Sequence, residues 1–197
     1  MKTKFSNLIS GLIVAAMILM AGTALISSTT GRLRAQERIN WFQFEQAIEM
    51  NQTRAEQGLA PKKIFVDVYT DWCGWCKKLD ATTFAHPEII DYLNQHFIAV
   101  KLNAERQDTV VINGQPFVYV PGEGRRGIHQ LAVILLQNRM SYPSCTFLDE
   151  SGQQLQVIPG YMNAKQFEAV LHFFGDDAYK TQDWETYSAN FKGKIAE

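Results

Sequence analysis

The motif Cys73-Gly74-Trp75-Cys76, within the stretch 71–77, follows closely after the apolar run 64–69. Such a run is typical of a buried strand, and we expect a helix to begin at the cysteines. At a helix N-terminus the unpaired backbone N–H groups favour the thiolate over the thiol. The spacing therefore predicts a small disulfide ring whose first sulfur, that of Cys73, faces solvent and exchanges with other disulfides.

A closely spaced cysteine pair can also bind zinc, attach haem or form a structural disulfide. A structural zinc site would need four ligands, usually from a second Cys or His pair at similar spacing. The remaining candidate ligands are scattered along the chain: Cys145, His86, His96, His129 and His172. Haem attachment needs His directly after the second cysteine, where this chain has Lys77. A purely structural disulfide stays open, although so short a loop removes little entropy from the unfolded chain. We expect no metal and no organic cofactor.

The composition limits the possible partners and the number of domains. The chain has 197 residues and a formal net charge of −1, which argues against broad electrostatic attraction to nucleic acid. Hydrophobic residues make up 46% of the chain and aromatic residues 12%, which is enough for one packed core. We therefore expect a monomer with a single domain of ordinary size.

The N-terminal stretch differs from the rest of the chain. Two lysines precede an uncharged, mostly apolar segment, 8–26. We expect residues 1–35 to be a signal peptide or a membrane anchor and residues 36–197 to form the folded domain. Cleavage at Ala35 is favoured, but an uncleaved anchor stays open because the apolar segment is nearly long enough to span a bilayer. Both alternatives predict an exported domain, in the periplasm, where stable disulfides are common.

Periodicity and turn signals predict alternating strands and helices. In chain order we expect a helix over 39–57, a strand over 64–69, a helix after the cysteines, a helix opened by Pro87, a strand over 97–102, a hairpin around Asn113-Gly114, a helix over 128–135, a hairpin between 146 and 158, a helix over 164–174 and a short helix within 176–197. Strand, helix and strand in this order imply a parallel pair. The sequence indicates no partner for His129, which we expect to be a surface or packing residue.

Over about residues 60–175 the chain resembles the thioredoxin superfamily. The matching features, in family order, are the strand with Asp67 in it, Trp72-Cys73-Gly74-Xaa-Cys76-Lys77, the strand 97–103, Pro143 before a hairpin and Gly160 ahead of the last helix. The Cys-Gly-Trp-Cys form and the long insertion look most like exported thioredoxin-like proteins of bacteria. The resemblance implies an α/β fold with a central mixed sheet flanked by helices. It also implies an insertion, a β-hairpin and loop at about 105–140 before the cis-proline strand, and a C-terminal extension at about 176–197.

The resemblance assigns roles to four residues in or near the predicted strands. Cys73 resembles the attacking cysteine and Cys76 the buried resolving cysteine. Asp67 resembles the buried acid that assists proton transfer at the resolving cysteine, and Lys101 resembles its charged neighbour. Burial would raise the pKa of such a carboxyl towards the range of a proton shuttle. A buried ion pair that only holds two strands in register is the alternative.

Five further residues are expected to contact the substrate. Pro143 resembles the family's cis-proline, which presents backbone groups to an extended peptide. Trp72 and Gly74 would flank the attacking sulfur. Trp75 replaces the proline that is usual in cytoplasmic members, and Tyr142 is bulkier than the residue that usually precedes the cis-proline. These two differences mean that neither reducing strength nor substrate choice can be transferred from the family.

One cysteine lies outside the motif. Cys145 follows Pro143 closely in the sequence, so it is either a buried strand thiol or a third redox group within reach of the pair.

The sequence thus predicts an exported thiol–disulfide oxidoreductase that reduces disulfides in extracytoplasmic proteins. A membrane electron donor would reduce it again. Two alternatives stay open: a disulfide donor or isomerase, and a binding module with this fold and no turnover.

Overall fold

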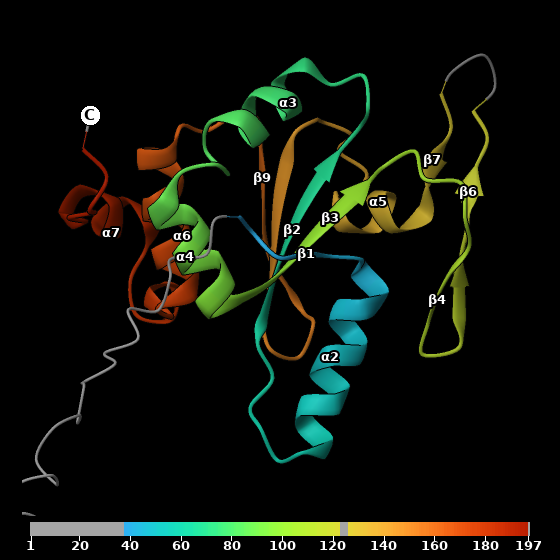
Figure 1. Ribbon diagram of the computed structural model, residues 1–197, viewed down its shortest axis with the longest axis horizontal. Coiled ribbons are helices and arrows are strands. Elements are labelled where there is room, and N and C mark those ends of the chain that lie inside the picture. The colour runs from blue at the N-terminus through green and yellow to red at the C-terminus, as the bar shows by residue number, and fades with distance from the viewer. Residues whose placement is uncertain (1–37, 123–125, 197) are drawn as a thin grey trace, which may run out of the picture. The chain divides into compact units, whose positions relative to one another are not determined.

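The computed structural model describes residues 38–122 and 126–196 (Figure 1). The expected signal peptide or anchor, residues 1–35, lies outside the described residues. Within the described parts of the chain, no helix is both long and apolar enough to cross a membrane. The prediction of an α/β fold with a central mixed sheet flanked by helices is confirmed.

The central sheet has five strands in the order β1-β3-β2-β8-β9. Its strands are β1 (Trp41–Phe42), β2 (Lys63–Tyr69), β3 (Phe97–Asn103), β8 (Ser144–Leu148) and β9 (Gln154–Pro159). β1 and β2 both run parallel to β3, whereas β8 runs antiparallel to β2 and to β9. The strand that leads to the cysteines, β2, is therefore central and pairs on both sides.

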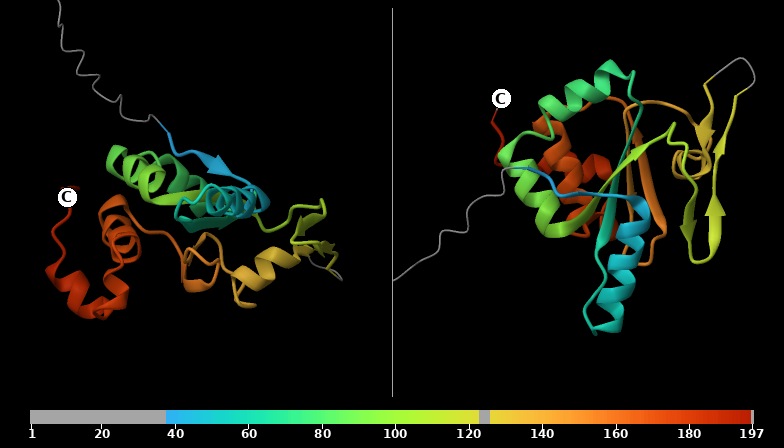
Figure 2. Two further views of the ribbon diagram at one scale, coloured as in Figure 1. Left: turned by 90° about the horizontal axis from the view of Figure 1, so that it is seen from below. Right: turned by 45° about the vertical axis from the view of Figure 1, so that its right-hand side comes forward.

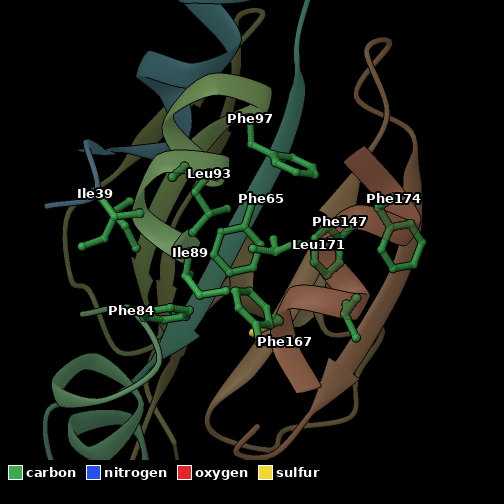
Figure 3. Packing of buried hydrophobic residues seen from close by; sticks show 14 of the residues in the cluster. Ile39, Phe65, Phe84, Ile89, Leu93, Phe97, Phe147, Phe167, Leu171 and Phe174 are labelled. Carbon is green, nitrogen blue, oxygen red and sulfur yellow. The ribbon is translucent and has the colours of Figure 1, made fainter. Parts of the chain in front are cut away.

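Helices cover both faces of this sheet, which explains why β2 is apolar on both faces. They are α2 (Phe44–Glu56), α3 (Gly74–Ala81), α4 (Pro87–His96), α5 (Gln130–Leu135) and α6 (Ala164–Gly175). Ile64 and Val66 of β2 pack in the cluster that contains residues of α2 and α5. Phe65 packs in the other cluster, with residues of α3, α4 and α6 (Figure 3). Because side chains alternate along a strand, Asp67 lies on the same face as Phe65, the face covered by α3.

The segment 39–57 departs from the predicted single helix. Trp41 and Phe42 form strand β1, in register with Ala99 and Val100 of β3, and the helix begins only at Phe44. Backbone pairing with a strand distant in the sequence overrides the local helical periodicity of these residues.

The predicted helix 128–135 is also shorter than expected, because Ile128–His129 forms strand β7. Of the two roles expected for His129, surface or packing, the structure shows packing, and it adds hydrogen-bond partners that the sequence did not indicate. Its side chain is fully buried, its Nδ1 accepts the N–H of Leu131 at 3.2 Å, and its Nε2 lies 3.1 Å from the carbonyl oxygen of Asp108. His129 thus caps α5 and ties it to the preceding loop.

The insertion contains two small antiparallel pairs ahead of α5. They are β4 (Val110–Ile112) with β5 (Gln115–Phe117), and β6 (Tyr119–Val120) with β7. Asn113 and Gly114 make the predicted turn, and both have positive φ, as a tight hairpin turn requires. In Figures 1 and 2 these strands and the C-terminal helices lie at opposite ends of the folded unit.

The C-terminal extension contains a 3₁₀ turn, η1 (Ala178–Lys180), and helix α7 (Trp184–Asn190). Rings of α7 pack on Phe173 of α6. The Nζ of the buried Lys63 lies 2.8 Å from Asp177, which joins the extension to the start of β2.

Candidate redox site

The two cysteines of the motif form a disulfide at the start of α3. Their Cα atoms are 5.3 Å apart. Cys73 is the N-cap residue of the helix, and its sulfur accepts the N–H of Cys76 at 3.0 Å. A sulfur in this position receives the partial positive charge of the helix N-terminus, which stabilises a thiolate there.

The structure corrects the expectation that the first sulfur faces solvent. In the disulfide form Cys73 is only 4% exposed and Cys76 only 3%. The hydrogen bond to the helix and the bond to Cys76 hold the Cys73 sulfur against the protein, while the neighbouring Trp72 and Trp75 are more than half exposed. In the disulfide form the surface around Cys73 is therefore made largely by its neighbours.

Asp67 and Lys101 form a buried ion pair on the face of the sheet that α3 covers. The Nζ of Lys101 lies 3.2 Å from Oδ2 of Asp67, and the two residues stand opposite each other on the parallel strands β2 and β3. The same Nζ also pairs with the carboxylate of Asp80 on α3. The other oxygen of Asp67, Oδ1, is buried without a hydrogen-bond partner among the described residues.

The environment of Asp67 changes its protonation. Burial raises the pKa of its carboxyl to about 6; Lys101 opposes this rise and the negative charge of Asp80 adds to it. An acid with a pKa near the working pH can both accept and return a proton. This arrangement is suitable for the predicted proton transfer at Cys76. It is equally compatible with the alternative, an Asp67–Lys101 ion pair that only holds β2 and β3 in register.

Asp80 gives a test of this electrostatic coupling. Replacing it with Asn removes one negative charge near Asp67 and frees Lys101 for Asp67, so the pKa of Asp67 should fall, by up to about one unit. Carbon NMR of the labelled Asp67 carboxyl would follow the titration directly. The Asp80→Glu variant, which keeps the charge, should titrate like the original protein. An unchanged midpoint in Asp80→Asn would contradict the coupling.

Pro143 lies at the start of β8, and its bond to Tyr142 is cis, as the resemblance implied. Its carbonyl oxygen accepts the N–H of Gly160 at 2.8 Å, which joins it to the segment after β9. Tyr142 contacts Trp72 edge to face, with ring centroids 5.9 Å apart. Two of the predicted substrate-binding residues, Trp72 and Tyr142, are therefore in contact, and the third, Pro143, is buried directly after Tyr142.

The other two predicted contact residues lie in the first turn of α3. Trp75 packs against Tyr161, with ring centroids 5.5 Å apart. Gly74 is exposed, and a Cβ atom added to it would meet no other atom within 4 Å. A substrate chain can therefore approach the start of the helix closely.

Cys145 is a fully buried, free thiol. It stands opposite Asp67 on the antiparallel strand β8. Burial, together with the negative charge of Asp67, raises the pKa of the Cys145 thiol well above its ordinary value. Since the thiolate is the reactive form, these features favour the buried strand thiol over a third redox group.

Among the residues that contact the predicted site residues, sequence reasoning missed Asp80, Glu105, Arg126 and Tyr161. Asp80 lies four residues after Cys76, one turn along the same helix, and this spacing could have indicated it. The other three come from the insertion and from the segment after β9, and no local pattern marks them.

Residues 50–175, more than half of the chain, match the thioredoxin-like domain. The chain belongs to the thioredoxin-like family. Two solved structures share its fold at a TM-score of 0.50. One is a thioredoxin-fold protein from Helicobacter pylori, 23% identical, covering 66% of this chain and 81% of its own. The other is described as DsbH oxidoreductase, 18% identical, covering 84% of this chain and 99% of its own.

Curated relatives carry the name thiol:disulfide interchange protein DsbD. The protein from Escherichia coli K12 is 25% identical over 165 residues, which cover 78% of this chain and 25% of the relative. The protein from Pectobacterium atrosepticum is 25% identical over 118 residues, 58% of this chain and 17% of the relative. The chain thus matches a quarter or less of the length of these relatives. The chain is therefore similar to one part of these proteins, and it contains a disulfide-bonded cysteine pair within a thioredoxin-like fold.

Proposed function

We propose that the protein is an exported disulfide reductase that acts on disulfides of extracytoplasmic proteins through Cys73 and Cys76. One observation carries the proposal: the cysteine pair begins a helix on the sheet face that holds Asp67 and Lys101, and Trp72, next to Cys73, contacts Tyr142, whose bond to Pro143 is cis. The apolar segment 8–26, preceded by lysines, supports export.

The reaction proceeds in two exchanges. The Cys73 thiolate attacks one sulfur of the substrate disulfide, so that a mixed disulfide forms and the other substrate sulfur leaves as a thiolate. Cys76 then loses its proton, to Asp67 in this proposal, and its thiolate attacks the Cys73 sulfur. The second substrate sulfur leaves, the substrate has gained two electrons, and the protein ends with the Cys73–Cys76 disulfide.

The surface around Pro143 would position the substrate for the first exchange. The cis bond presents the backbone beside the disulfide, and an extended segment can pair with it as an added strand. Trp72, Gly74, Trp75 and Tyr142 would surround the substrate cysteine.

A membrane electron donor would return the disulfide to the dithiol. No metal or organic cofactor enters either exchange. In this proposal the domain, 36–197, acts as a monomer and is either released from residues 1–35 or held at the inner membrane by the segment 8–26.

The reduction potential of the purified domain tests the direction. We expect a value near about −270 mV, which is typical of thioredoxins, when the protein is equilibrated with glutathione or dithiothreitol buffers and the thiols are counted by alkylation. A value near about −120 mV, typical of strong periplasmic oxidants, would reject the reductase and favour a disulfide donor. The Cys145→Ser variant is the control that removes the third thiol from the count.

A further inference from the structure

Each of the two tryptophans beside the disulfide has a cation over its ring. The guanidinium carbon of Arg126 lies 5.4 Å from the ring centroid of Trp72. The Nζ of Lys78 lies 4.7 Å from the ring centroid of Trp75 and 5.0 Å from that of Tyr161. Such cation–π contacts are favourable even at exposed sites. The surface that a substrate cysteine must enter is therefore aromatic and bordered by positive charge.

The insertion holds Arg126 in this place. The N–H of the next residue, Gly127, donates to the hydroxyl of Tyr119 at 3.0 Å, and a Cβ atom on Gly127 would lie only 2.4 Å from the Tyr119 ring. Glu105 contacts both partners of the Arg126–Trp72 pair. Its carboxylate accepts the Trp72 Nε1–H at 2.9 Å and lies 3.5 Å from Nη1 of Arg126. The backbone after Arg126 is thus held by Tyr119, and the guanidinium contacts Glu105 and the Trp72 ring.

Both cations keep donors free for a substrate. The side chain of Arg126 is 68% exposed, and its guanidinium has five N–H donors, of which one is directed to Glu105. Lys78 is exposed as well. A second acid near these rings, Asp71, precedes Trp72 in the sequence. Its carboxylate accepts the side-chain amide N–H of Asn103 at 3.1 Å. Arg126 and Lys78 therefore present positive charge at the two aromatic contacts that flank the disulfide.

We propose that Arg126 and Lys78 are specificity residues that select protein segments in which acidic side chains flank the disulfide-bonded cysteine. A planar guanidinium stacked on an aromatic ring keeps its edge free to pair with a carboxylate. The inference rests on the proposed exchange through Cys73 and adds the substrate class. It also gives the insertion a role, because Arg126 comes from it.

The test uses three cysteine peptides, each joined to thionitrobenzoate as a mixed disulfide, with Glu, Gln or Lys on both sides of the cysteine. The reduced protein attacks the peptide sulfur through Cys73 and releases thionitrobenzoate, whose colour gives the rate. Cys76 then displaces the reduced peptide, and the two electrons come from the protein dithiol. At low salt we expect the Glu peptide to react about tenfold faster than the Lys peptide, and the ratio should fall as salt rises.

The variants assign the preference to the two cations. Arg126→Gln and Lys78→Gln should each reduce the Glu-to-Lys ratio about threefold, and the double variant should bring it near one. Arg126→Lys, which keeps the charge without the planar stack, should lie between. Lys192→Gln removes the same charge from the C-terminal extension and should leave the ratio unchanged.

The outcomes separate this inference from the proposed function. If the original protein reacts with none of the three peptides, including the uncharged one, the exchange itself is wrong. If it reacts with all three at equal rates, or if the ratio is the same in the double variant, the exchange stands and the selection of acidic segments is overturned.

Discussion

Replacing Cys76 with Ala is expected to stop turnover and to leave substrate proteins covalently attached to the enzyme. The second exchange needs the Cys76 thiolate, so without it the mixed disulfide on Cys73 persists. We expect a loss of at least about a thousandfold in steady-state reduction, since what remains is direct attack by external thiols. Non-reducing gels of extracytoplasmic extracts would show adducts that disappear with dithiothreitol, and mass spectrometry would identify the trapped cysteine.

Two double variants make this result specific. Cys73→Ala together with Cys76→Ala should trap nothing, because the attacking sulfur is gone. Cys145→Ser with Cys76→Ala should trap as much as Cys76→Ala alone, because Cys145 is fully buried. Adducts attached through Cys145, or turnover that survives in Cys76→Ala, would contradict the proposed mechanism. Unchanged binding and phenotype in that variant would favour a binding module without turnover.

Replacing Asp67 with Asn is expected to stabilise the fold at neutral pH and to slow the second exchange. The folded protein holds the pKa of Asp67 at about 6, above the ordinary value of 3.8. Below about pH 4 the carboxyl is protonated in both the folded and the unfolded chain and costs nothing. Between pH 4 and 6 only the unfolded chain ionises, so the free energy of unfolding of the original protein falls as pH rises. Well above pH 6 the free energy of unfolding is lower than at pH 4 by about 3 kcal/mol from this group.

The neutral Asn avoids this cost, and Lys101 keeps Asp80 as its partner. Urea unfolding at pH 4 and pH 8 measures the effect: the two proteins should be similar at pH 4, and the variant should be more stable by up to about 3 kcal/mol at pH 8. Glu56→Gln, at the exposed end of α2, is the control and should change stability little at either pH. Stability equal to that of the original protein at pH 8 would mean that Asp67 is not strained by burial.

The same variant separates the proton shuttle from a purely structural ion pair. A shuttle predicts that release of substrate from the mixed disulfide slows by about tenfold or more, while the first attack by Cys73 changes little. A structural pair predicts changed stability with unchanged release. Stopped-flow measurement of both exchanges, over a range of pH, distinguishes the two.

Much of the fold could be predicted because its signals are local. The apolar run 64–69 forms the expected buried strand, the expected helix over 164–174 opens with a capping box of Asn163 and Gln166, and Asn113-Gly114 makes the expected turn. Each of these depends on residues that are near one another in the sequence. The prediction of a helix at Trp41 was wrong, because this segment pairs as a strand with β3, which is far along the chain.

The features of the site also divide into those set by neighbouring residues and those set by contacts between distant segments. Adjacent residues determine the cysteine pair, the helix that it begins and the apolar strand before it. Their backbone propensities and their hydrophobicity act over only a few positions. The cis bond at Pro143, the low exposure of Cys73, the shared pairing of Lys101 with Asp67 and Asp80, and the contact of Arg126 with Trp72 arise only when distant segments pack together. Such contacts depend on the geometry of the whole core, which no short stretch of sequence contains.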